Sequence, residues 1–173
     1  MSMAFTTGLR ALSTVRPLSC CGAALLASLP FGAQIEKPIK WTAMSTTSMG
    51  ITGDILETTD ELVIQNRHLK LTPVRKVENQ ELTDAAELLN ATVNSETRAQ
   101  LYKTYLPADT RLHSNNTLCG RSATSWVVML HTVGKGGGIN LDLAFFSGSQ
   151  QPNLTPAVIS TSRDLCGTFW YQK

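Results

Sequence analysis

The chain has 173 residues, with 15 Lys or Arg and 13 Asp or Glu, which gives a formal net charge of +2. It is 42% hydrophobic and 16% charged, a composition typical of a folded domain and not of a disordered chain. Arg10 and Arg16 are the only charged residues of the leader, so the rest of the chain has equal numbers of acidic and basic side chains. This balance argues against a nucleic-acid partner. No apolar run reaches the ~18 residues of a membrane-spanning helix.

Residues 1–33 have the order of a secretion signal. Arg10 and Arg16 precede an apolar stretch, 20–31, whose 12 residues fit a signal-peptide core. We expect cleavage after Ala33 and a periplasmic or secreted mature protein. The alternatives are a mitochondrial transit peptide and a lipid anchor on one of the two cysteines that begin the stretch. The concentrated apolar block disfavours the first, and the position of the cysteines before that block disfavours the second.

Cysteine usage agrees with export. Cys20 and Cys21 lie in the leader, which leaves Cys119 and Cys166 in the remaining chain. Two cysteines in an exported domain predict one disulfide, and free thiols in a reducing compartment are the alternative. No metal site is predicted, because the sequence has no CxxC motif and no close pair of histidines.

The first half of the mature chain contains one arm, several short strands and one helix. Residues 34–48 are polar and rich in Ser and Thr, so we expect a flexible arm before a single β-rich domain over 49–173. Apolar runs separated by turn residues predict three short strands over 49–77. Apolar residues at three- and four-residue spacing predict a helix within 78–98.

The C-terminal third has the clearest strand patterns. Residues 124–133 are rich in β-branched side chains, residues 139–146 alternate in period two, and the glycine-rich segment 134–138 is typical of a hairpin loop between them. Further strands are predicted at 101–105 and 165–171. About seven strands and one accessory helix favour a mainly β fold, an antiparallel barrel or sandwich.

No motif predicts a catalytic residue or a cofactor. The glycine-rich segment 134–138 joins two strands, whereas a phosphate-binding loop joins a strand to a helix. Ser147 lacks the glycine that a nucleophile elbow places two residues before its serine. His68, His113 and His131 are the only imidazoles, and the sequence does not show whether any of them meets a serine and a carboxylate.

Asp142 is the most informative polar residue, because it interrupts an apolar strand. Its carboxylate either faces solvent or points into a barrel as a binding determinant, and the alternation favours solvent. Together with Phe146, Ser147, Gly148 and Ser149 it forms our candidate partner-binding surface.

The segments NNTLCG, LDLAFFSG and LCGTFWY resemble those of small exported proteins of Gram-negative bacteria that have no assigned function. The resemblance covers about residues 48–172, implies a periplasmic location and carries no catalytic residues. In size and architecture the chain is also similar to periplasmic lysozyme inhibitors, small disulfide-containing β-barrels. Those proteins insert a Ser-Gly loop and a basic residue into the lysozyme cleft, and Ser147-Gly148-Ser149 would correspond to that loop.

These observations predict an exported, non-catalytic binding or inhibitor module of the cell envelope. Its expected partner is another envelope protein or a glycan hydrolase, and we expect no cofactor, metal or nucleic acid. The alternatives are a small hydrolase with loop-borne catalytic residues and a barrel that binds lipid or another apolar ligand.

Overall fold

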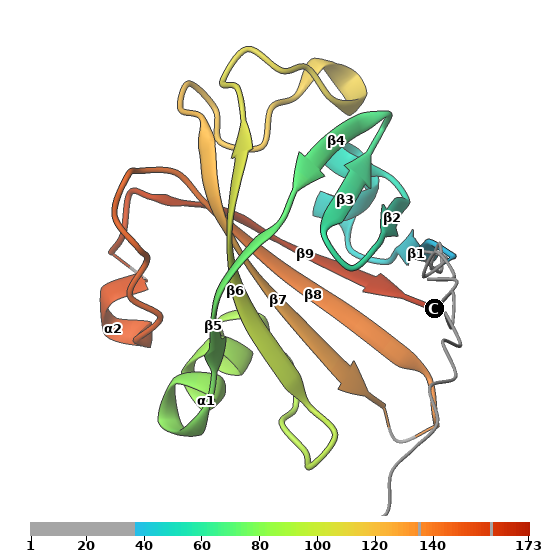
Figure 1. Ribbon diagram of the computed structural model, residues 1–173, viewed down its shortest axis with the longest axis vertical. Helices are drawn as coiled ribbons and strands as arrows, with labels where there is room; N and C mark the ends of the chain where they lie inside the picture. Colours follow the sequence, from blue (N-terminus) through green and yellow to red (C-terminus); the bar gives the residue numbers. More distant parts are fainter. Residues whose placement is uncertain (1–36, 135, 160) are drawn as a thin grey trace, which may run out of the picture. The chain divides into compact units, whose positions relative to one another are not determined.

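The computed structural model describes residues 37–134, 136–159 and 161–173, so the predicted signal peptide lies outside the described residues. The described residues form a mainly β domain with nine antiparallel strands in one sheet (Figure 1). The strands are β1 (Ile39–Ala43), β2 (Ile55–Glu57), β3 (Glu61–Ile64), β4 (Arg67–Lys70), β5 (Thr72–Val77), β6 (Arg98–Leu106), β7 (Thr124–Val133), β8 (Ile139–Phe146) and β9 (Leu165–Gln172). The helices are α1 (Asn79–Leu88) and the short α2 (Pro156–Ile159), with a π-helical turn at Ser48–Thr52 and a 3-10 turn at His113–Asn115. In this part of the chain no helix has the length and apolarity to cross a membrane.

The sheet closes on itself because its two end strands are one piece of chain. The strand order is β4-β3-β2-β1-β9-β8-β7-β6-β5, and only Leu71 separates β4 from β5. Figure 1 shows this segment leaving β3 and continuing to β6. The Leu71 N–H donates to the carbonyl of Asp60 at 2.7 Å at the point where the chain changes partners. The result is a nearly closed, barrel-like sheet, an arrangement that leaves few unpaired strand edges.

Side chains on the inner face fill the barrel. In β8, Leu141, Leu143 and Phe145 are each fully buried and point inward in the period-two pattern of a strand. Trp41 of β1 and Tyr171 of β9 belong to the same cluster and are also almost completely buried. Apolar side chains from all around the sheet therefore occupy the interior.

A second apolar layer covers the outer face of strands β5 to β8. Val128, Leu130 and Phe146 point outward and are buried against α1 and the segment around α2. Ala85 and Ala86 present the apolar side of α1 to this layer, because they lie three and four residues after Leu82, which packs against the same layer. Strands β7 and β8 are thus buried on both faces, which explains their nearly continuous apolar sequence.

The structure has nine strands where the sequence analysis predicted about seven. The last of the three strands predicted over 49–77 is divided into β4 and β5, because the chain changes partners at Leu71. The other additional strand is β1, and the short helix α2 was not predicted. The helix α2 has four residues, about one turn, which is too short to give a readable helical period.

The structure differs from the predicted flexible arm over 34–48, because β1 lies within that range. Lys40 and Trp41 of β1 pair with β2, while Thr42 and Ala43 pair with β9. Trp41 is 1% exposed, and the burial of its large indole stabilises the strand although the neighbouring residues are polar. This short strand joins β2 to β9 and so links the β2-β3-β4 part of the sheet to the part formed by β5 to β9.

The two cysteines of the domain lie at disulfide-bonding distance, as the sequence predicted. Cys119 lies in the loop before β7 and Cys166 lies in β9, with their Cα atoms 4.6 Å apart. Both pack against the apolar cluster inside the barrel. The disulfide therefore ties the last strand to a loop 47 residues earlier in the chain.

Replacing both Cys119 and Cys166 by Ser should lower the free energy of unfolding by about 4 kcal/mol, the chain-entropy value for a loop of this length. Equilibrium urea denaturation of the oxidised protein and of the double variant measures the difference. A reducing agent should destabilise the original protein and leave the variant unchanged. Equal stability of all four samples would contradict a structural role for the disulfide.

Candidate functional site

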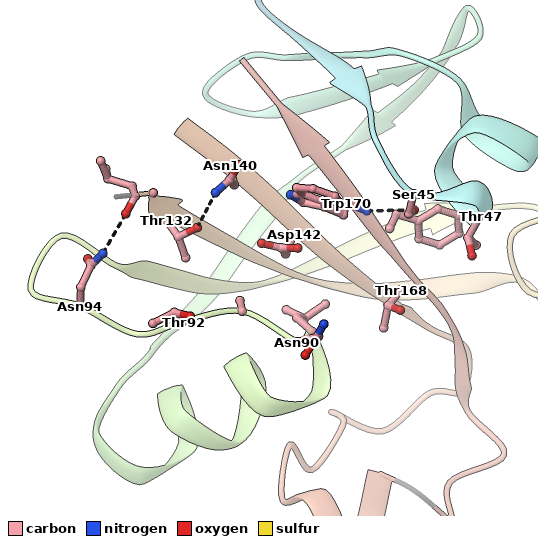
Figure 2. A pocket seen from close by; sticks show the side chains of 15 residues that line it. Ser45, Thr47, Asn90, Thr92, Asn94, Thr132, Asn140, Asp142, Thr168 and Trp170 are labelled. Atoms are coloured by element: carbon pink, nitrogen blue, oxygen red, sulfur yellow. Dashed lines mark hydrogen bonds between the residues drawn. The ribbon is translucent and has the colours of Figure 1, made fainter. Parts of the chain in front are cut away.

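A cleft of about 670 Å³ lies on the outer face of the sheet, over β7, β8 and β9 (Figure 2). Its second wall is the segment 89–94 that follows α1, and residues 45 and 47 contribute at the other side. Three asparagines (Asn90, Asn94, Asn140) and five hydroxyl side chains (Ser45, Thr47, Thr92, Thr132, Thr168) line it. The cleft is thus rich in uncharged groups that both donate and accept hydrogen bonds.

The segment that walls the cleft is positioned at both of its ends. Asn90 terminates α1 in the left-handed conformation, with φ of 53°. Its N–H donates to the carbonyl of Glu87 at 3.1 Å, and the N–H of Ala91 donates to that of Ala86 at 2.8 Å, the bonding pattern of a Schellman motif. Further along, the Asn94 amide donates to the carbonyl of Val133 at 2.9 Å.

Asp142 lies in the middle of the labelled side chains of Figure 2. Its neighbours Leu141 and Leu143 point into the barrel, so its carboxylate points outward into the cleft. It is only 6% exposed, and within the described residues its side chain has no hydrogen bond or ion pair. Burial raises the pKa of Asp142 from 3.8 to about 7, and the charge of His131 lowers it in part.

The cleft has one ionisable side chain among its described lining residues, and that residue is Asp142. Neither a lysine nor an arginine of this part of the chain lines the cleft, so it offers no cation to a phosphate or a carboxylate ligand. Near neutral pH the Asp142 carboxyl is close to half protonated, because its pKa is about 7. The group can therefore accept a hydrogen bond or, when protonated, also donate one.

Trp170 is the aromatic residue of the cleft that is open to solvent. It pairs directly with Asp142 across β8 and β9, so both side chains lie on the same face of the sheet. Its side chain is partly free, since the residue is 40% exposed. Its backbone is held in place, because its carbonyl accepts from the N–H of Met44 at 2.9 Å and from the Ser48 hydroxyl at 3.0 Å.

The structure separates Asp142 from the other four candidate residues of the sequence analysis. Phe146 is 1% exposed and packs in the outer apolar layer. Ser147 is also buried, and its backbone N–H donates to the carbonyl of Asp164 at 2.8 Å. Gly148 packs against the Asp164 side chain, and Ser149 is exposed. None of the four lines the cleft.

The predicted solvent exposure of Asp142 is wrong for a physical reason. The period-two pattern correctly placed its side chain on the face opposite Leu141 and Leu143. A strand pattern does not show what covers that face, and here a segment some fifty residues earlier in the chain, around Asn90, covers it. The cleft residues on that segment, such as Asn90 and Thr92, give no sequence signal beyond being poor helix formers.

A second polar cluster lies inside the barrel at Glu57. The Glu57 carboxylate accepts from the Trp41 indole at 2.7 Å and lies 3.1 Å from His131 Nε2. The rings of Trp41 and His131 are 5.8 Å apart between centroids. Tyr102 lies close enough for the Glu57 charge to add to the effect of burial, and both raise the pKa of the phenol.

The histidines of the described residues are not arranged as a hydrolytic triad. His131 pairs with Glu57 and His68 pairs with Glu61, and none of the described histidines hydrogen-bonds a serine or threonine hydroxyl. Within the same residues no group of three or more His, Cys, Asp and Glu is placed to hold a metal ion.

No protein-family model, curated protein or solved structure matches this chain.

The stability of the protein should fall as the pH rises from 5 to 8, by on the order of 2 kcal/mol through Asp142 alone. The folded-state pKa of Asp142, about 7, lies above the value of 3.8 in an unfolded chain. The contribution of its proton to stability is therefore complete below pH 3.8 and lost as the pH rises through 7. Urea denaturation of the original protein and of D142N at both pH values measures it. The variant should lack this part of the pH dependence, and parallel curves would contradict the assignment.

Replacing Glu57 by Ala should destabilise the fold by about 2 kcal/mol, because the buried Trp41 indole loses its acceptor. E57Q keeps a side-chain oxygen for that indole, so its loss should be smaller. Denaturation of the two variants at pH 7 compares them directly. Equal losses would mean that the Trp41 hydrogen bond contributes little.

Proposed function

We propose that this protein is an exported, non-catalytic binding module whose cleft holds a small ligand that donates hydrogen bonds to Asp142. The observation that carries the proposal is Asp142, a residue only 6% exposed whose side chain faces an open cleft and has no hydrogen bond or ion pair within the described residues. A buried polar group without a partner costs about 1–3 kcal/mol, and more when it is charged. A ligand hydroxyl or ammonium group removes that cost on binding.

The dimensions and the rigidity of the cleft support a binding role. Its volume of about 670 Å³ is within the range of ~300–1,000 Å³ that is usual for small-molecule sites. One wall is regular sheet, and the other is held at Asn90 and Asn94 by backbone and amide hydrogen bonds. A site that is formed before binding loses less entropy when the ligand arrives.

Export is part of the proposal and is supported by the disulfide pair. Cys119 and Cys166 lie at bonding distance, and stable disulfides are typical of oxidising compartments. The leader, in which basic residues precede an apolar stretch, also indicates export from the sequence alone.

The other functions considered have less support from the geometry. An inhibitor loop at 147–149 would have Ser147 buried against Asp164 and only Gly148 and Ser149 open to a partner. A barrel that carries an apolar ligand would need space inside, where the apolar cluster of Leu143, Phe145 and its neighbours is packed. The cleft lies outside that cluster and is polar.

Binding is tested by two-dimensional NMR of the oxidised full-length chain with three probes: myo-inositol, putrescine and succinate. We expect myo-inositol or putrescine to shift the amide signals of Asn90, Asp142 and Trp170. Succinate should not shift them, because the described residues that line the cleft include a carboxylate and neither a lysine nor an arginine.

A variant that fills the cleft provides the control. T168F places a ring in the cleft and should weaken binding at least tenfold, whereas T72F places the same ring on an exposed position of β5, outside the cleft. Thermal unfolding confirms that both variants are folded. Shifts that map away from the cleft, or equal binding by both variants, would overturn the proposal.

A further inference from the structure

We infer that the ligand of the cleft is a neutral carbohydrate, a pyranose whose hydroxyl groups bind Asp142 and whose C–H face stacks on Trp170. This inference rests on the proposed function and adds the chemical class of the ligand. It is argued from the free hydrogen-bonding groups of the cleft, from its charge and from the position of its one exposed aromatic ring.

Some polar side chains of the cleft already hydrogen-bond within the protein, and others are free to bind a ligand. The Asn94 amide already helps to hold the fold: its nitrogen donates to Val133, and its oxygen accepts from the N–H of Glu96 at 2.9 Å and from the Thr97 hydroxyl at 3.2 Å. In Asn140 the amide nitrogen donates to the Thr132 hydroxyl at 3.4 Å, while its oxygen has no hydrogen-bond partner within the described residues.

Asn90 and Asp142 are free in the same sense, since neither side chain makes a hydrogen bond within the described part of the chain. Asn90 lies on the segment after α1, while Asn140 and Asp142 lie two residues apart on β8 and share a face. The available groups are therefore one amide with donors and an acceptor, one amide oxygen and one carboxyl. They converge from both walls of the cleft.

This set discriminates between the two kinds of ligand that Asp142 could bind. An ammonium group only donates hydrogen bonds, so it would offer no acceptor to the donors of Asn90. A sugar hydroxyl both donates and accepts, so it satisfies carboxyl, amide and hydroxyl groups alike. Because a ligand that pairs with more of these groups gains more hydrogen bonds on binding, the lining favours a polyhydroxylated ligand over an amine.

Trp170 adds the geometry that selects a ring. It is the direct cross-strand partner of Asp142, so an indole ring and a carboxyl group lie next to each other on one face of the sheet. A pyranose has the matching pattern, with C–H groups across one face and hydroxyls around its edge. When it stacks on the indole, the apolar contact is removed from water and the edge hydroxyls reach the polar wall.

The test measures binding of glucose, galactose, mannose and N-acetylglucosamine to the oxidised full-length chain by NMR titration, with putrescine as the amine probe. We expect at least one of the pyranoses to shift Asn90, Asp142 and Trp170 together, and to bind more tightly than putrescine. W170L should weaken the pyranose at least tenfold, because leucine keeps apolar bulk and removes the flat ring.

The control for this substitution is Y105L, which removes an aromatic ring that is 66% exposed on β6 and does not line the cleft. It should bind the pyranose as the original protein does. D142L should abolish binding, and D142N, which keeps a side-chain oxygen, should retain part of it. Thermal unfolding of each variant establishes that it is folded.

The outcomes separate this inference from the proposed function. Binding of putrescine at the cleft without any of the pyranoses would overturn the carbohydrate assignment and leave the binding module intact. Equal binding by W170L and Y105L would also overturn it. If no probe shifts the cleft signals, both the inference and the proposed function fail.

Discussion

Strand β8 is covered on both of its faces, and the environment of Asp142 follows from this double burial. Leu141 and Leu143 on either side of it point into the barrel, while Ala144 and Phe146 point outward beneath the helices. An aspartate on such a strand loses most of its water whichever way it points. The loss of water disfavours the charged carboxylate and therefore raises the pKa of Asp142.

The cleft exists because the outer cover is incomplete at one end of the sheet. Helix α1 packs on the sheet through Ala85 and Ala86, and then Asn90 ends it and turns the chain. The segment that follows crosses the outer face without filling it and is held at Asn94 to the end of β7. Its two attachment points are backbone-directed hydrogen bonds, so the width of the cleft is set by the fold and does not depend on a ligand.

The sequence predicted those parts of the structure that depend on neighbouring residues. Strands β7, β8 and β9 follow from β-branched content and period-two alternation, and the pairing of Cys119 with Cys166 follows from the number of cysteines in an exported domain. Parts that depend on distant contacts were not predictable. β1 is a strand because the barrel buries Trp41, and Asp142 is buried because the segment at Asn90 crosses it; no local pattern encodes either contact.

Along strands β7 and β8 the outward side chains change from apolar to polar, and this change is the strongest argument that the cleft is a binding surface. On β7 the outward side chains run from Val128 and Leu130 to Thr132, and on β8 they run in the opposite direction from Asn140 and Asp142 to Ala144. Where α1 covers the sheet, the side chains are apolar and packed; where the cover ends, Thr132 and Asn140 lie opposite each other, and Asp142 lies between the apolar Leu130 of β7 and the exposed Trp170 of β9. Packing alone would favour continued apolar residues at Asp142, since a neutral side chain there avoids the cost of a buried carboxyl. The polar patch coincides with the cleft, so its residues suit contact with a ligand better than contact with the protein itself.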